Sequence, residues 1–131
     1  MSRALSEALS DTIVVTVDTE YLDQQSVEED NRFVFAYHIR IQNQGDQGAT
    51  LRTRHWFIAD GNNEVQEVKG EGVVGEQPTI EPGETYRYSS GAVLATRVGS
   101  MRGYYVMDAD DGTLFHASIP VFTLATPNAL N

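Results

Sequence analysis

Alternation of apolar and polar residues is the dominant pattern of this chain, and it predicts β-strands. The clearest predicted strand spans residues 33–42, where every second side chain is apolar and falls on one face. The residues of this face are Phe33, Phe35, Tyr37, Ile39 and Ile41. Residues 12–19 are rich in β-branched side chains and predict an earlier strand with the same period.

Turn residues divide the rest of the chain into further strands. The segments NQGDQG at 43–48 and DGNN at 60–63 contain residues that tolerate a positive φ. They predict that strand 33–42 pairs in a hairpin with a strand at 50–59, and that this strand pairs in a second hairpin with a strand at 64–68.

Three more strands are predicted at residues 84–90, 99–109 and 114–122. Pro82-Gly83 precedes the first of them, and the turn at 110–112 separates the other two. Pro120 cannot donate a ladder hydrogen bond, so the last strand belongs at a sheet edge or a bulge.

Seven or eight short strands without a helical period predict an all-β fold. The spacing of the turns favours an antiparallel two-sheet sandwich of immunoglobulin or fibronectin type III type, with a small barrel as the alternative. We expect a single domain at residues 12–127, preceded by a flexible segment 1–11 and followed by a short tail 128–131.

The single tryptophan lies on a predicted strand with two mixed faces. One face carries Leu51 and Phe57, and the other carries Arg54, Trp56 and Ile58. Sandwiches commonly bury an aromatic residue on this central strand, so we place Trp56 and Ile58 in the core. Arg54 then lies near the rim of the inner face.

Composition limits the classes of function. The 131 residues are enough for one core, and the absence of cysteine excludes disulfides, thiolate zinc sites and cysteine nucleophiles. Nine basic against nineteen acidic residues give a net charge of −10, which opposes binding to nucleic acid.

The N-terminal residues predict a cytoplasmic location. Residues 1–11 mix charged and short apolar side chains and contain no continuous apolar run of the kind that a secretory signal has. No segment has the roughly 18 apolar residues of a membrane-spanning helix. We therefore expect no membrane association.

One glycine motif suggests a ligand site. Residues 70–75 spell G-x-G-x-x-G, the pattern that holds a pyrophosphate in dinucleotide-binding folds when a strand enters it and a helix leaves it. Pro78 and Pro82 follow closely, so no helix begins here. The motif therefore does not predict a dinucleotide-binding enzyme.

Six short segments occur together in this chain. They are residues 33–37 (FVFAY), 54–58 (RHWFI), 70–78 (GEGVVGEQP), 82–84 (PGE), 88–91 (YSSG) and 99–105 (GSMRGYY). In this order they resemble the bacterial ApaG family, and the resemblance extends from about Ile13 to about Pro127.

The resemblance implies one immunoglobulin-like or fibronectin type III sandwich, in agreement with the strand pattern. It also implies an association with cobalt resistance and magnesium efflux, and a relation to a domain of eukaryotic F-box proteins that recognises partners. The family's glycine motif, proposed as a pyrophosphate or nucleotide site, falls here on Gly70, Gly72 and Gly75.

The glycine segment allows two interpretations. Successive N–H groups can form an anion-binding concavity without a helix, to which Lys69 would add positive charge. Alternatively, the glycines permit a compact crossing between sheets. The second interpretation is favoured because Glu71 and Glu76 would repel a phosphate.

Other polar groups give weaker signals. The turn Asp108–Gly112 resembles the start of a calcium loop, but its twelfth position is Ile119 and no helix flanks it. His38, His55 and His116 lie on three strands without metal-ligand spacing. Ser89, Ser90 and Ser100 lack the G-x-S-x-G elbow of hydrolases, so no catalytic or metal residue is predicted.

These observations favour a non-enzymatic interaction module without a cofactor, acting on an unidentified protein partner. Core or sheet-face packing is the favoured interpretation of Tyr104, Tyr105, Tyr86 and Tyr88, and any of them that is exposed is a candidate for a recognition surface. Sheet edges also allow another chain or a second copy to add a strand. The first alternative is a nucleotide or polyphosphate site at Lys69, Gly70, Gly72 and Gly75. The second is a metal-dependent phosphohydrolase that uses the acidic turn.

Overall fold

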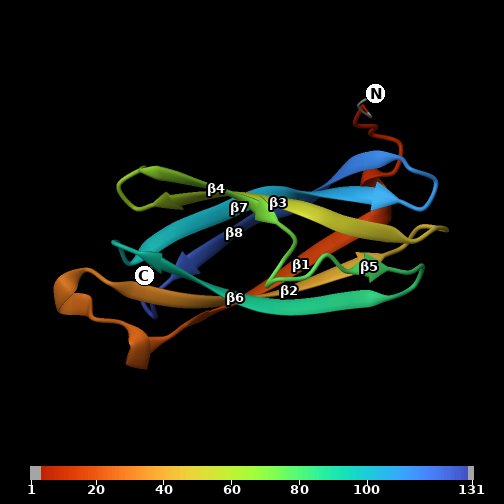
Figure 1. Cartoon of the computed structure of the whole chain (residues 1–131). Helices are drawn as coiled ribbons and strands as arrows, with labels where there is room; N and C mark the ends of the chain where they lie inside the picture. The colour runs from red at the N-terminus through yellow and green to blue at the C-terminus, as the bar shows by residue number, and fades with distance from the viewer. Residues whose placement is uncertain (1–3, 130–131) are drawn as a thin grey trace.

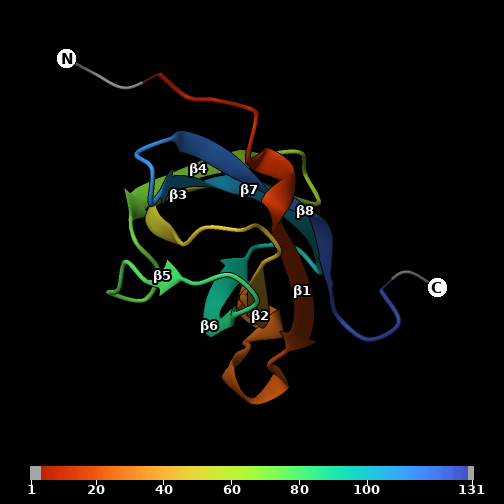
Figure 2. The ribbon, with the colours of Figure 1, turned by 90° about the vertical axis from the view of Figure 1, so that its right-hand side faces the viewer.

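Two antiparallel sheets packed face to face make up residues 4–129, the part of the chain that the computed structural model describes (Figures 1 and 2). The strands are β1 (Ile13–Tyr21), β2 (Phe33–Asn43), β3 (Ala49–Asp60), β4 (Val65–Glu71), β5 (Thr79–Ile80), β6 (Thr85–Leu94), β7 (Val98–Ala109) and β8 (Leu114–Ala125). Three 3-10 turns are η1 (Ser10–Thr12), η2 (Asp23–Gln25) and η3 (Glu28–Asp30). The predicted sandwich is confirmed.

The two sheets have the strand orders β1-β2-β6 and β4-β3-β7-β8, and the two-residue β5 pairs with the start of β3. The predicted hairpin between β3 and β4 is confirmed by their antiparallel register. The predicted hairpin between β2 and β3 is wrong, because these strands belong to different sheets. Residues 43–48 are not a hairpin turn but the connection that carries the chain from one sheet to the other.

Asn43 is the reason that this connection can be tight. Its side chain is 1% exposed, and its Nδ2 donates to the carbonyl oxygens of Gln47 at 2.9 Å and Ile80 at 2.8 Å. Its Oδ1 accepts the N–H of Gly45 at 2.9 Å. One buried amide therefore joins the crossing to β5 through three hydrogen bonds to the backbone.

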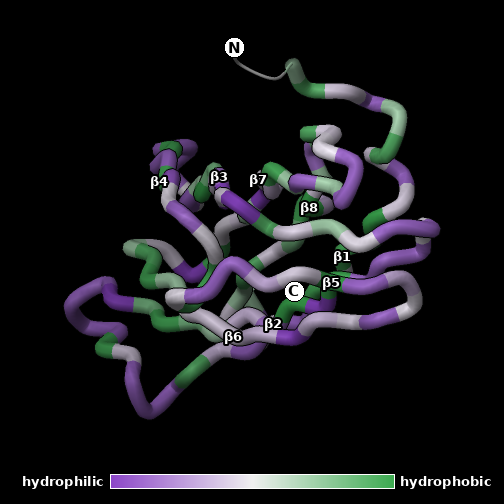
Figure 3. Tube along the Cα trace, turned by 45° about the vertical axis from the view of Figure 1, so that its right-hand side comes forward, coloured by the Kyte–Doolittle hydropathy of each residue, from purple (hydrophilic) through white to green (hydrophobic). Residues whose placement is uncertain are grey.

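Alternation along the strands builds the core as predicted. Phe33, Phe35, Tyr37, Ile39 and Ile41 are all buried. Figure 3 shows the same alternation of hydropathy along the strands, whereas the connection between β1 and β2 is largely hydrophilic.

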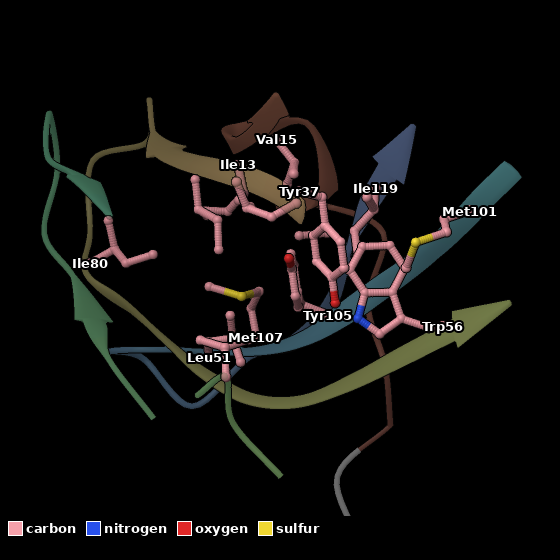
Figure 4. Packing of buried hydrophobic residues seen from close by; sticks show 14 of the residues in the cluster. Ile13, Val15, Tyr37, Leu51, Trp56, Ile80, Met101, Tyr105, Met107 and Ile119 are labelled. Carbon is pink, nitrogen blue, oxygen red and sulfur yellow. The ribbon is translucent and has the colours of Figure 1, made fainter. Parts of the chain in front are cut away.

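A β-bulge decides which side of β3 faces the core. The register with β7 shifts between Leu51 and Thr53, so Leu51 and Trp56 both point inward although their spacing is odd. Figure 4 shows these two side chains among the buried residues. Opposite Trp56, a Cβ on Gly103 would lie 2.0 Å from the carbonyl oxygen of His55, so glycine permits the close approach of β7 to β3. The predicted burial of Trp56 is confirmed, and Ile58 packs partly against the core.

β8 is an edge strand, and its pairing with β7 is irregular next to Pro120. Phe122 lies opposite Met101 and Ile119 opposite Gly103, so β8 has one extra residue between the two pairs. The predicted edge or bulge position of this proline is confirmed. Within residues 4–129, no helix is long and apolar enough to cross a membrane.

A hydrogen bond between two tyrosines joins the sheets through the core. The hydroxyls of Tyr88 on β6 and Tyr105 on β7 lie 2.5 Å apart, and Tyr105 is fully buried. Burial raises the pKa of both hydroxyls above their ordinary value of 10, and the neighbouring Tyr88 hydroxyl adds to the rise for Tyr105. Both tyrosines are therefore neutral in the folded protein.

This pair predicts a loss of stability in alkaline solution. Because the folded pKa values exceed the unfolded ones, the unfolded chain loses these protons first as the pH rises past about 10. The stabilisation is complete below that pH and falls above it, by up to about 1.4 kcal/mol per pH unit for each tyrosine. Urea unfolding at pH 9 and pH 11 measures the effect.

The double variant Tyr88→Phe, Tyr105→Phe should lose less stability over this range than the unchanged protein. Tyr104→Phe, on the outer face of the same strand, is the matched control and should behave like the unchanged protein. Equal losses in all three proteins would contradict the assignment.

Candidate functional site

The sandwich is open along the side where the edge strands β4 and β6 face each other. One cavity of about 370 Å³ lies between the residue 71–75 segment and β6, and it is lined in part by Arg54, Trp56 and Ser90. A second, of about 270 Å³, lies further along β6 beside the tip of the β3-β4 hairpin, where Glu64 and Val93 are among its lining residues. We call these two cavities together the edge groove.

The glycine segment forms a tight turn at one end of the edge groove. Val73 and Glu76 exchange backbone hydrogen bonds of 2.8 and 3.0 Å, with Val74 and Gly75 between them at φ values of 48° and 81°. Two successive positive φ values are the signature of a type I′ turn. Figure 1 shows the chain descending from β4 through this segment to β5.

Val74 is unusual because β-branched residues rarely adopt a positive φ. Its side chain is 65% exposed and lines the 370 Å³ cavity, so burial in the core does not explain it. Strained backbone of this kind is concentrated at functional sites.

The same segment holds Arg54 in place. Nη1 of Arg54 donates to the carbonyl oxygens of Glu71 at 3.0 Å and Gly72 at 2.9 Å. A Cβ on Gly70 would lie 2.6 Å from Nη2, so the guanidinium lies directly over this glycine. The first glycine of the motif thus makes room for an arginine, at the rim of the inner face where the strand pattern predicted it.

The predicted phosphate-binding residues are not all brought together. The N–H of Gly72 donates to the carbonyl of Arg52 at 2.8 Å, and Gly75 lies in the turn. The Lys69 ammonium lies 3.4 Å from the Glu67 carboxylate, and Glu67 in turn contacts His55. These contacts place Lys69 with the side chains of the outer face, whereas Gly70 lies on the inner side.

Aromatic and hydroxyl groups line the rest of the larger cavity. Tyr37 and Trp56 meet edge to face with ring centroids 5.4 Å apart, and Figure 4 shows them side by side. Tyr88 extends from β6 to its buried partner, while Ser89 and Ser90 are exposed at the margin. The cavity therefore combines one fixed cation, aromatic surface and the Ser90 hydroxyl, because the Ser89 hydroxyl faces His38 on the outer side of the sheet.

The histidines lie on the two outer faces. His38 Nδ1 lies 2.6 Å from Ser89 Oγ, and its Nε2 lies 3.3 Å from Glu20. This serine, histidine and glutamate chain lies across three adjacent strands, with exposed side-chain fractions of 44% for His38 and 59% for Glu20. It is a cross-strand polar network on an exposed sheet face.

His55 and His116 flank Tyr104 on the other outer face. His55 contacts the Tyr104 hydroxyl at 2.7 Å and the Glu67 carboxylate at 2.6 Å, and this contact holds the pKa of Glu67 below its ordinary value. Tyr104 stacks on His116 with centroids 4.1 Å apart. This outer aromatic cluster therefore contains Tyr104, one of the four tyrosines that the sequence analysis considered for a recognition surface.

The carboxylates of Asp110 and Asp111 in the acidic turn accept hydrogen bonds from backbone N–H groups of the protein. Asp110 accepts the N–H of Gly48 at 3.0 Å. Asp111 accepts the N–H of Thr113 at 2.9 Å, and hydrogen bonds from Thr113 hold the pKa of Asp111 below its ordinary value. In the described part of the chain, no group of three or more His, Cys, Asp or Glu residues is arranged to hold a metal ion.

These features define the protein as a two-sheet antiparallel sandwich with a groove between two edge strands. A profile described as the ApaG domain matches residues 23–109. The Protein ApaG of Pseudomonas aeruginosa strain PAO1 is 58% identical over 126 residues, which cover 94% of this chain and all of that protein. The chain belongs to the ApaG family.

Further relatives agree with this assignment. The Protein ApaG of Pseudomonas putida strain W619 is 56% identical, with 91% of this chain and 94% of that protein covered. The crystal structure of a Bordetella pertussis protein superposes with a TM-score of 0.87 at 44% identity, covering 89% of this chain and 95% of that one. An X-ray structure of a structural genomics target superposes with a TM-score of 0.90 at 51% identity, covering 95% and 94%.

The turn geometry makes a prediction about stability. A Cβ on Gly72, at φ 63°, would lie 2.1 Å from the Glu76 carbonyl oxygen, so Gly72→Ala should destabilise the protein by about 2 kcal/mol or more. Gly75→Ala, with no atom within 4 Å of the new Cβ, should cost about 1 kcal/mol. Urea denaturation compares the two.

Val74→Asn should instead stabilise the protein by about 0.5 to 1 kcal/mol, because asparagine tolerates the positive φ of this turn. Val93→Asn, an exposed strand position, is the matched control and should not stabilise. A Gly72→Ala variant no less stable than Gly75→Ala would contradict the turn geometry.

Proposed function

We propose that this protein is a non-enzymatic recognition module that binds an extended segment of another protein along the free edge of β6. The observation that carries the proposal is that β6 pairs with β2 on one side and, within residues 4–129, with no strand on the other, where its edge borders the edge groove at residues 89–93. An added strand would make backbone hydrogen bonds to β6 while its side chains entered the two cavities.

The hydrogen-bond pattern of β2 identifies the free groups of β6. The N–H of Asn43 donates to the carbonyl of Glu84 at 3.0 Å, so residue 84 bonds toward β2. Since the direction alternates in an antiparallel ladder, the even-numbered residues of β6 bond to β2. Ser89, Gly91 and Val93 direct their N–H and C=O groups away from it.

The other edge strands are β8, β1 and β4. On β8, Leu114 pairs with Leu5, and its carbonyl accepts the N–H of Ser6 at 2.7 Å, so the N-terminal segment covers the start of this edge. β1 packs beside β8 and carries the charged residues Asp18 and Glu20. The β4 edge carries Glu67 and Lys69, and charged side chains oppose strand addition. Residues 88–94 of β6 contain neither a charge nor a proline.

The chemistry of the edge groove supports binding rather than catalysis. Its fixed polar group is a guanidinium already bonded to two carbonyl oxygens, which suits it to hold an anion. Ser89 contacts His38 on an open sheet face. Hydrolysis of p-nitrophenyl acetate by the protein at a rate that Ser89→Ala abolished would contradict the non-enzymatic proposal.

Nucleotide or polyphosphate binding at Lys69, Gly70, Gly72 and Gly75 stays the alternative, and calorimetry with ATP and pyrophosphate tests it. The cytoplasmic location and the association with cobalt and magnesium stay predictions from the sequence and the resemblance. The module would serve cation homeostasis through the protein that it binds. Restoration of cobalt resistance in a deletion strain by the unchanged gene tests this association.

If the peptide binds the free edge of β6, variants that remove an N–H group from this edge should lose binding. A random 12-residue peptide library displayed on phage and selected on the full chain should yield binders that shift the backbone amide resonances of Ser89, Gly91 and Val93. Ser89→Pro removes an outward N–H and should weaken these binders about tenfold or more, while changing stability by less than about 1 kcal/mol.

Two variants are the controls. Ser89→Ala keeps the N–H and should bind normally, whereas Ser90→Pro removes a hydrogen bond to β2 and should destabilise the fold by about 3 kcal/mol. Val93→Pro tests the edge a second time if Ser89→Pro perturbs the strand. Selected peptides that bind both proline variants as well as the unchanged protein would overturn the proposal.

A further inference from the structure

The two ends of the edge groove carry opposite charges. Arg54 lines the cavity beside the glycine segment, and Asp60 and Glu64 line the cavity at the other end. A ligand that occupied both cavities would therefore meet a cation at one end and carboxylates at the other. This arrangement deepens the proposed function and rests on it.

Arg54 is suited to bind a carboxylate. Nη1 is held by two backbone carbonyls, and within residues 4–129 Nε and Nη2 make no hydrogen bond to the protein. A planar guanidinium fixed along one edge loses little side-chain entropy when it binds an anion, and two remaining donors match the two oxygens of a carboxylate. Trp56 and Tyr88 beside it lower the local exposure to water.

Glu64 is the available acceptor at the opposite end. Its side chain is exposed at the tip of the β3-β4 hairpin, whereas one oxygen of Asp60 accepts the N–H groups of Asn62 at 2.8 Å and Glu64 at 3.1 Å. Val65 and Val93, both exposed, line the cavity with them. A long basic side chain can lay its methylene groups over these valines and reach Glu64 with its charge.

The spacing along β6 sets the spacing of the ligand's charges. Ser89 and Ser90 border the Arg54 cavity, and Val93 and Leu94 border the other. The two pairs are four residues apart, or about 13 Å along a strand. Four is an even number, so side chains at this spacing project from the same face of an added strand.

We propose that the edge groove selects an extended peptide in which a lysine or arginine is followed four residues later by an aspartate or glutamate. The peptide runs antiparallel to β6, which places its basic residue beside Glu64 and its acidic residue on Arg54. An antiparallel ladder is the stronger pairing, and β6 runs from the Arg54 end of the groove to the Glu64 end.

Charge argues against a second copy of this chain as the occupant. Each copy carries a net charge of −10, so two copies repel one another. The free segment of β6, Ser-Ser-Gly-Ala-Val, also has no charged side chain to offer to Arg54 or Glu64. A peptide with one charge of each sign matches both ends of the groove.

Capped peptides of sequence GKVTVEG, GEVTVKG, GAVTVEG and GKVTVAG test the proposal in titrations of the full-length, isotope-labelled protein followed by NMR. We expect GKVTVEG to bind most tightly, GKVTVAG about tenfold more weakly, and GAVTVEG about threefold more weakly because Glu64 is exposed. The reversed peptide GEVTVKG should also lose affinity.

Matched variants of the protein test whether Arg54 binds the acidic residue of the peptide. Arg54→Gln should weaken GKVTVEG about tenfold but leave GKVTVAG unchanged, so the second peptide also reports that the groove is intact. Arg54→Lys should restore part of the affinity, and Arg87→Gln, on the outer face of β6, should have no effect.

The outcomes separate this inference from the proposed function. If all four peptides bind equally and Ser89→Pro abolishes binding, strand addition stands and the charge pattern is overturned. If none shifts the amides of residues 89–93 at millimolar concentration and the library yields no binder there, both are overturned. Displacement of GKVTVEG by millimolar pyrophosphate but not by acetate would show that Arg54 serves a phosphate instead.

Discussion

The hydrogen bond between Tyr88 and Tyr105 is the interaction on which the groove side of the sandwich depends. Most contacts between the sheets are apolar and have no preferred direction. A hydrogen bond between two buried hydroxyls has a preferred length and angle, and it fixes β6 relative to β7. Because Tyr88 also lines the larger cavity, the same contact sets the depth of the groove.

The position of the glycine motif beside β3 explains the roles of its three glycines. Its glycines serve backbone geometry: one leaves room for the Arg54 guanidinium, one avoids a clash with Glu76, and one completes a two-residue turn. Each role requires the absence of a side chain rather than the presence of a ligand. A sequence pattern shared with nucleotide-binding loops is thus compatible with a different task, the clamping of an arginine beside a strand edge.

Much of the fold could be predicted from the sequence because alternation is a local property. The five inward residues of β2 were identified by period alone, and the burial of Trp56 followed from the position of its strand. Strand pairing is not local, so NQGDQG predicted a hairpin where the chain instead crosses between sheets around Asn43. The two-residue β5 is too short to carry a period.

The candidate site was only partly predictable for related reasons. The face of β3 placed Arg54 at the rim, but its partners are carbonyl oxygens, which every residue possesses and no pattern marks. The positive φ of Val74 was hidden because valine normally avoids it. The free edge of β6 depends on which strands fail to pair, and this is known only once the whole topology is known.

The bulge on β3 has a consequence for how the site can change in evolution. Arg52 is the extra residue that reverses the phase of the strand, so Leu51 and Arg54 both face inward. Deletion of Arg52 would remove the bulge but leave Leu51 and Arg54 on the inner face, two positions apart as in a regular strand. If β3 kept all twelve residues but paired with β7 without the bulge, Arg54 would turn outward and His55 inward. The position of this arginine therefore depends on a local backbone irregularity as well as on its place in the sequence. Substitutions near Arg52 that disfavour the bulge can move the arginine to the other face, although they leave the arginine itself unchanged.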